Sequence, residues 1–202
     1  MKTSSNYCRL SQRALFCIFL QLPALAQANP QIGPSTGFTS VLAHPLTGLD
    51  HICAMIAVGL WAAQRGGRAL WLVPLTFVSI MTIGGIVGAA KIGIPFVEPG
   101  IAASVLVLGL LIAAAIQLPL WASMLLVGLF AFCHGHAHGW EMPVVASGIL
   151  FGLGFIVSTI ILHACGVGIG LAAKRGGSTR LIRYAGGAIA VGGIYLCVTV
   201  LN

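Results

Sequence analysis

Residues 132–141 hold three of the chain's six histidines and one of its three acidic residues, at the end of a long apolar run. A helix advances about 100° per residue, so side chains four and seven positions apart return to one face. We therefore expect His134, His138 and Glu141 on one side of a helix, with His136 pointing nearly the opposite way. Two imidazoles and a carboxylate that converge in this way suit a divalent metal ion. An alternative interpretation is that the histidines are interfacial residues, hydrated at a membrane surface.

A second motif whose side chains could bind a metal spans residues 44–51, with the sequence His-Pro-Leu-Thr-Gly-Leu-Asp-His. Proline suits the first turn of a helix and disfavours helical geometry in the residue before it. His44 is therefore expected at the mouth of a helix, with Asp50 and His51 nearly two turns deeper. An aspartate at that depth in a membrane is costly unless it is paired or faces a polar cavity. Asp50 would bind a metal directly or orient an imidazole. The alternative is that Asp50 is only the buried partner of a histidine and has no role in transport.

Two further residues are weaker candidates for metal binding. Cys133 adjoins His134 and would offer a soft ligand, although a small buried hydrophobe is the alternative interpretation. His163 stands alone in an apolar segment. It is either a hydrogen-bonded interior group or a relay farther along a pathway.

The composition identifies the setting of these residues as a membrane. Of 202 residues, 58% are hydrophobic and only 6% are charged, and the mean hydropathy is +1.04. Soluble proteins carry roughly 25% charged residues. We expect an all-α, polytopic membrane helix bundle. The net charge of +7 does not predict a nucleic-acid partner, because the basic residues lie at the ends of apolar runs.

Residues 1–28 have the pattern of a cleaved secretory signal peptide. Basic residues precede a short apolar core whose first part is residues 14–20. Ala28 is the last residue of a small-x-small cleavage site. An uncleaved anchor helix is the alternative. Cleavage would leave residues 29–202 as a single transmembrane domain whose N-terminus starts outside the cytoplasm.

Apolar runs between breakers predict six transmembrane helices in this domain, joined by short loops. They cover residues 37–63, 69–90, 97–116, 119–138, 143–172 and 181–201. With the N-terminus outside, six basic residues fall on the cytoplasmic side: Arg65, Arg68, Lys174, Arg175, Arg180 and Arg183. Only Lys91, with Glu98 beside it, falls outside, as the positive-inside rule requires. The same topology places both histidine motifs at the outer side of the membrane.

Two small-residue motifs predict close helix contacts within the bundle. They are Gly84-x-x-x-Gly88 and Gly148-x-x-x-Gly152. In lipid, pairs of this kind allow two helix backbones to approach closely.

The two histidine motifs together resemble the HupE/UreJ family of nickel and cobalt permeases. The resemblance rests on His44-Pro-x-x-Gly-x-Asp-His51 and on Phe132-x-His-Gly-x-Ala-His-Gly-x-Glu141, and Val97-Glu-Pro-Gly100 also fits the family. It implies a bacterial inner-membrane protein that moves Ni²⁺ or Co²⁺ to supply hydrogenase, urease or cobalamin synthesis. The His-to-Asp spacing of the first motif is one residue longer than in the broader nickel–cobalt transporter group, so identical coordination is not implied.

These features predict a secondary transporter or facilitator that imports Ni²⁺ or Co²⁺, with Zn²⁺ also suited to the ligands. No tightly bound cofactor is expected, and no GxxxxGK[ST] motif predicts an ATPase. One alternative is an intramembrane zinc metalloenzyme, although HExxH is absent. Another is a metal-binding accessory or sensor subunit without transport. The sequence leaves open whether the chain forms a homo-oligomer.

Overall fold

The structure, a computed structural model, describes residues 48–142 and 148–202, all within the compact unit Thr36–Asn202. Three expectations therefore lie outside the described residues: the signal peptide at 1–28, the position of His44, and the helical segments at 37–47 and 143–147.

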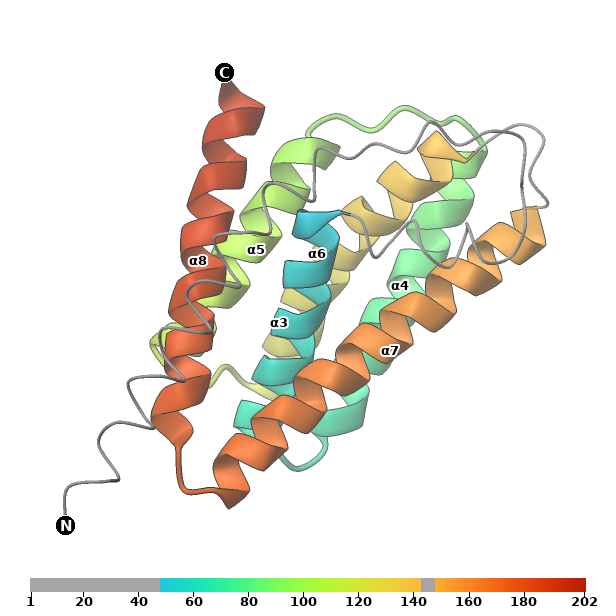
Figure 1. The fold of residues 1–202 in the computed structure, drawn as a ribbon. Helices are drawn as coiled ribbons and strands as arrows, with labels where there is room; N and C mark the ends of the chain where they lie inside the picture. The colour runs from blue at the N-terminus through green and yellow to red at the C-terminus, as the bar shows by residue number, and fades with distance from the viewer. Residues whose placement is uncertain (1–47, 143–147) are drawn as a thin grey trace, which may run out of the picture. The chain divides into compact units, whose positions relative to one another are not determined.

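The described residues form six helices without a strand, which confirms the expected all-α bundle (Figure 1). The helices are α3 (Leu49–Arg65), α4 (Ala69–Ala89), α5 (Val97–Ala113), α6 (Leu120–Glu141), α7 (Gly148–Arg175) and α8 (Thr179–Leu201). Helix α6 runs three residues beyond the expected end at 138 and so carries the whole histidine-rich stretch.

The start of α3 corrects the expected depth of Asp50. Gly48 is the N-cap, with an extended backbone (φ −82°, ψ 116°), and the helix begins at Leu49. Asp50 thus lies in the first turn of α3 and not nearly two turns inside a helix. The partial positive charge of a helix N-terminus stabilises a carboxylate at this position.

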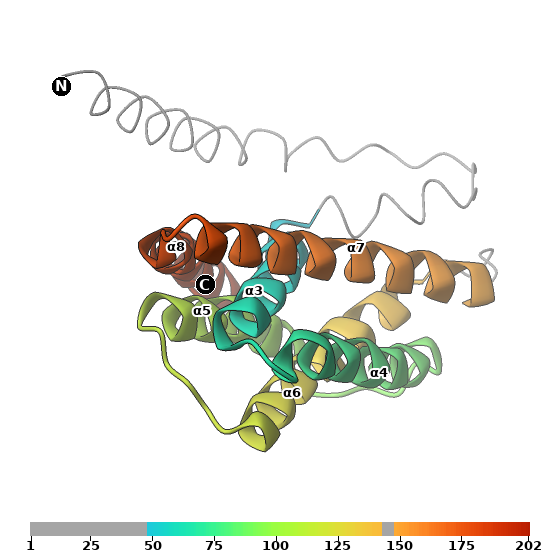
Figure 2. The same ribbon diagram turned by 90° about the horizontal axis from the view of Figure 1, so that it is seen from below.

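The bundle is built from three tightly packed helix pairs, α4 with α6, α5 with α8, and α3 with α7 (Figures 1 and 2). Helix α3 also contacts α4, α5 and α8, and most of its side chains are buried. At about 1.5 Å per residue, its 17 residues span about 26 Å, less than the roughly 30 Å of a bilayer core.

Glycines set the distance between α4 and α6. A Cβ added at Gly135 would lie 1.9 Å from the Met81 carbonyl oxygen, and one at Gly139 would lie 2.1 Å from that of Gly85. The predicted contact of Gly84 and Gly88 is confirmed, because both face the α6 backbone at comparable distances.

The second predicted glycine contact is wrong for the described part of the chain. A Cβ at Gly152 would meet nothing within 4 Å. Helix α7 instead approaches α3 through Gly166, where a Cβ would lie 2.4 Å from the Ile56 carbonyl oxygen. Spacing alone does not show which side of a long apolar helix faces a neighbour.

The outer surface of the bundle suits a lipid bilayer. Helices α4, α6, α7 and α8 are long and apolar enough to cross a membrane, and α5 is a shorter apolar helix. Large apolar side chains point outward, among them Trp71, Ile86, Trp121, Leu125, Ile149 and Val191. The chain is thus a multi-pass membrane protein.

The two ends of the bundle carry opposite charges. Sequential helices alternate in direction (Figure 1), so the starts of α3 and α5 lie at the same end as the finish of α6. Asp50, Glu98 and Glu141 occupy those three positions. The six basic residues named above lie at the opposite end, around the 66–68 and 176–178 connections.

The α4–α6 contact generates a test with an internal control. Gly135→Ala should lower the thermal stability of the detergent-solubilised protein, because overpacking a close contact costs about 1–3 kcal/mol. Gly152→Ala makes the same chemical change on an open helix face and should leave the melting temperature unchanged. Equal melting temperatures for both variants would contradict the tight α4–α6 contact.

Candidate metal site

All three acidic residues of the chain line one pocket of about 190 Å³. Asp50 comes from the first turn of α3, Glu98 from the first turn of α5 and Glu141 from the last turn of α6. His134 and His138 of α6 line the same pocket. The helical spacing correctly predicts that these two histidines share a face with Glu141.

The local sequence around Asp50 shapes this pocket. Asp50 Oδ1 accepts a hydrogen bond of 2.7 Å from the backbone N–H of His51. A Cβ at Gly48 would lie 2.8 Å from the same oxygen. Glycine at position 48 therefore leaves room for the carboxylate to fold back onto the start of α3, where helix N–H groups favour negative charge.

Three imidazoles gather between α3 and α6 behind the carboxylates. The ring centroid of His51 lies 5.5 Å from that of His134 and 5.0 Å from that of His138. Phe155 of α7 packs against this cluster, with its ring centroid 4.2 Å from that of His138. His51 and His134 are each only 1% exposed. The structure thus brings together the deeper part of the first motif and one face of the second.

Two hydroxyl groups contact the buried imidazoles. Ser104 Oγ of α5 lies 2.9 Å from His134 Nε2, and Thr159 Oγ1 of α7 lies 3.5 Å from His51 Nε2. Groups of this kind fix the ring orientation of metal-binding histidines.

The structure does not bring His136 to this pocket. Its Nε2 lies 2.8 Å from the Ile92 carbonyl oxygen, and its ring stacks on Trp140. Lys91 Nζ donates to the Trp140 carbonyl and lies over the Trp140 ring. His136 therefore secures the 90–96 connection on another face of α6, as its offset in the helix predicts.

Cys133 and His163 do not line this pocket either. Cys133 packs against α5, because a Cβ at Gly100 would lie 2.7 Å from its Sγ. His163 is 3% exposed, and its ring contacts Phe77, with a centroid distance of 5.1 Å. Phe77 in turn lies 5.9 Å from His134. Phe77 thus separates His163 from the imidazole cluster.

Comparison with known proteins agrees with the motifs and the fold. Residues 17–196 match the HupE / UreJ protein family. The chain belongs to the HupE/UreJ family. It is 43% identical to Protein HupE of Rhizobium leguminosarum bv. viciae over 181 aligned residues. The alignment covers 89% of this chain and 93% of that protein. No solved structure matches the chain. The HupE/UreJ family is associated with nickel and cobalt transport.

Sequence reasoning missed three residues at or beside this candidate site. Glu98 is one of only three acidic residues and opens a helix beside a proline, so its rarity was an available signal. Ser104 and Thr159 gave no signal, because serine and threonine are common in membrane helices as backbone-bonded residues.

Carboxylate oxygens and imidazole nitrogens are ligand types that suit a divalent transition metal. Among residues 48–142 and 148–202, no three His, Cys, Asp or Glu side chains converge closely enough to hold an ion. The three carboxylates, His134 and His138 instead line a common pocket.

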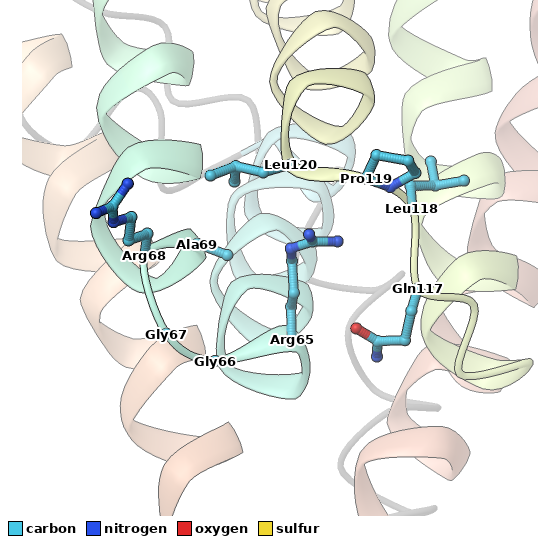
Figure 3. A pocket seen from close by; sticks show the side chains of 9 residues that line it. All are labelled: Arg65, Gly66, Gly67, Arg68, Ala69, Gln117, Leu118, Pro119 and Leu120. Atoms are coloured by element: carbon cyan, nitrogen blue, oxygen red, sulfur yellow. The ribbon is translucent and has the colours of Figure 1, made fainter.

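A larger pocket, of about 570 Å³, lies at the basic end and has different chemistry (Figure 3). Arg65, Arg68 and Gln117 line it together with backbone and apolar side chains, and its lining includes no histidine, cysteine or acidic residue. Two guanidinium groups disfavour a metal cation. The acidic end is therefore the better candidate for a metal ion, despite the smaller volume there.

Paired histidine variants test the assignment of the two α6 faces. In purified protein in detergent, His138→Gln should weaken Co²⁺ binding by tenfold or more, because an imidazole ligand is lost. His136→Gln retains an amide that can donate to the Ile92 carbonyl, so it should change the affinity by less than about threefold. Isothermal titration calorimetry measures both. An equal loss in the two variants would contradict the separation of the faces.

Proposed function

We propose that this protein is a secondary transporter or facilitator that imports Ni²⁺ or Co²⁺ across the bacterial inner membrane. The observation that carries the proposal is the convergence of all three acidic residues on one pocket above buried imidazoles. Ionisable groups within a membrane bundle are costly and mark ion pathways. The HupE/UreJ family membership supports the same class of substrate.

Mutual repulsion among the carboxylates favours capture of a dication. Asp50 and Glu98 each experience the charge of Glu141, and Glu98 also experiences that of Asp50. A dication between them offsets this repulsion. His44, the first residue of the first motif, is proposed to assist the capture from the outer side.

The imidazoles take over the metal after capture. His51, His134 and His138 lie behind the carboxylates, and nitrogen ligands suit Ni²⁺ and Co²⁺ better than oxygen ligands alone. An ion that meets carboxylate oxygens first and imidazole nitrogens next therefore exchanges its bound water for protein ligands in stages. It never loses its whole hydration shell in one step.

His163 is the next residue on this route. Neither of its ring nitrogens has a hydrogen-bond partner among the described residues, although the side chain is buried. Leaving a buried polar group unsatisfied costs about 1–3 kcal/mol. A passing metal ion would satisfy a nitrogen of His163 beyond Phe77.

The membrane potential is sufficient to drive the proposed import. One charge moving across 100 mV gains about 2.3 kcal/mol, so a dication gains about 4.6 kcal/mol, an accumulation ratio on the order of 10³. The positive-inside rule orients the basic end toward the cytoplasm, so the carboxylate pocket would face the outside. Import therefore requires no ATP hydrolysis by this chain.

Uptake of radioactive nickel by nickel-starved cells tests the carboxylates. Asp50→Asn and Glu98→Gln keep the side-chain shape but remove the charge, and each should reduce saturable uptake at least tenfold. Thr82→Val is the control, because Thr82 is an exposed residue of α4 that bonds only its own helix at Val78. Immunoblots of membranes verify equal amounts of protein. Wild-type levels of uptake in both acidic variants would refute the capture step.

A variant of His163 separates capture from passage. His163→Leu should lower the maximal rate of nickel uptake severalfold, while the concentration at half-maximal uptake stays close to the wild-type value, because the outer pocket is intact. An unchanged maximal rate would remove His163 from the route and leave it a structural residue.

A further inference from the structure

We infer that Ser104 is a positioning residue that holds His134 in the Nε2–H tautomer and presents its Nδ1 lone pair as the metal donor. The inference deepens the proposed function and, in its use of a metal, rests on it. Its structural content, the tautomer of one buried histidine, stands on hydrogen-bond geometry alone.

The proton of the Ser104 hydroxyl is already committed. Ser104 Oγ donates to the Ile101 carbonyl oxygen at 2.6 Å, and the side chain is fully buried at 0% exposure. A carbonyl can only accept, and a hydroxyl has a single proton. Oγ therefore has only lone pairs to offer to any other group.

The remaining contact then assigns the proton on His134. Oγ lies 2.9 Å from His134 Nε2, a normal hydrogen-bond distance. Because Oγ can only accept here, Nε2 must donate and so carries the ring proton. In a neutral imidazole the lone pair then belongs to Nδ1. His134 lines the carboxylate pocket, so this nitrogen is the ring atom available to a metal ion.

The contact also joins two helices at the site. Ser104 belongs to α5, which carries Glu98 in its first turn, and His134 belongs to α6, which carries Glu141 in its last turn. One hydroxyl thus sets the orientation of an imidazole relative to carboxylates from two helices. Loss of partners that orient metal-binding histidines typically weakens metal affinity by 10–100-fold.

Thr159 does not impose the same constraint on His51. Its hydroxyl lies 3.5 Å from both His51 Nε2 and the Met81 sulfur. A thioether is a weak acceptor, so the hydroxyl proton is not committed to it. The distance to His51 Nε2 is also at the upper limit of a hydrogen bond.

The competing explanation is that Ser104 only satisfies its own helix, as serines in membrane helices commonly do. Ser123 of α6 provides the matched comparison. It is equally buried at 0% exposure, and its Oγ donates to the Pro119 carbonyl oxygen at 3.2 Å. Ser123→Ala therefore removes the same kind of backbone bond far from the histidines.

The direct test is nuclear magnetic resonance of the full chain in micelles, with ¹⁵N-labelled histidine and no metal. Correlations between ring nitrogens and carbon-bound ring protons distinguish the two neutral tautomers, and His134→Gln assigns the signals. We expect Nε2–H at His134 in the wild type and in Ser123→Ala, and a mixture of tautomers in Ser104→Ala. The Nδ1–H tautomer in the wild type, or no change in Ser104→Ala, would overturn the inference.

Cobalt binding to the same proteins measures the consequence. Ser104→Ala should weaken Co²⁺ affinity by about 10–100-fold, with a loss of thermal stability no larger than that of Ser123→Ala. Ser104→Thr, which keeps the hydroxyl, should restore the affinity. Equal Co²⁺ affinity for Ser104→Ala and wild type would refute the positioning role. Tight Co²⁺ binding by a wild type that shows no uptake would refute transport instead, so the two failures are distinguishable.

Discussion

The close approach of α4 and α6 is the constraint on which the site depends. Gly135 and Gly139 press against α4 where no larger side chain fits. Because each residue is offset by about 100° from the next, this contact fixes the directions of the flanking histidines. His134 and His138 turn toward α3, and His136 turns toward the 90–96 connection. The alternation of glycine and histidine in α6 thus combines a packing surface with a ligand surface on one helix.

The placement of charge follows from the cost of ionisable groups in a membrane. Each acidic residue lies at a helix end, and the two in first turns benefit from the positive ends of α3 and α5. Together they form a region that attracts dications at one end of the bundle, whereas six of the seven basic residues in the described part of the chain, all except Lys91, lie at the other. The deeper part of the site is lined by imidazoles, which are neutral in their unprotonated form and cost less to bury than carboxylates.

Much of this arrangement could be predicted from the sequence. For α4, α5, α6 and α8 the apolar runs predict bounds within three residues of those observed, and helical periodicity places His134, His138 and Glu141 together. Glu98 was not recognised, because only the packing of α5 beside α3 and α6 brings it to Asp50 and Glu141. The start of α3 was misplaced, since the extended backbone of Gly48 is not evident from hydropathy. The helix partners of Gly152 and Gly166 also depend on tertiary packing, which a local motif does not encode.

The most direct test of the account is metal flux through the purified protein in liposomes. An inward-negative potential would be imposed with potassium and valinomycin, and Ni²⁺ entry would be followed with a trapped fluorescent chelator. The account predicts saturable, potential-dependent entry that is abolished by His51→Ala together with His138→Ala. Entry no faster than in protein-free liposomes, from protein that binds Ni²⁺ tightly, would contradict transport and identify a metal-binding accessory or sensor subunit.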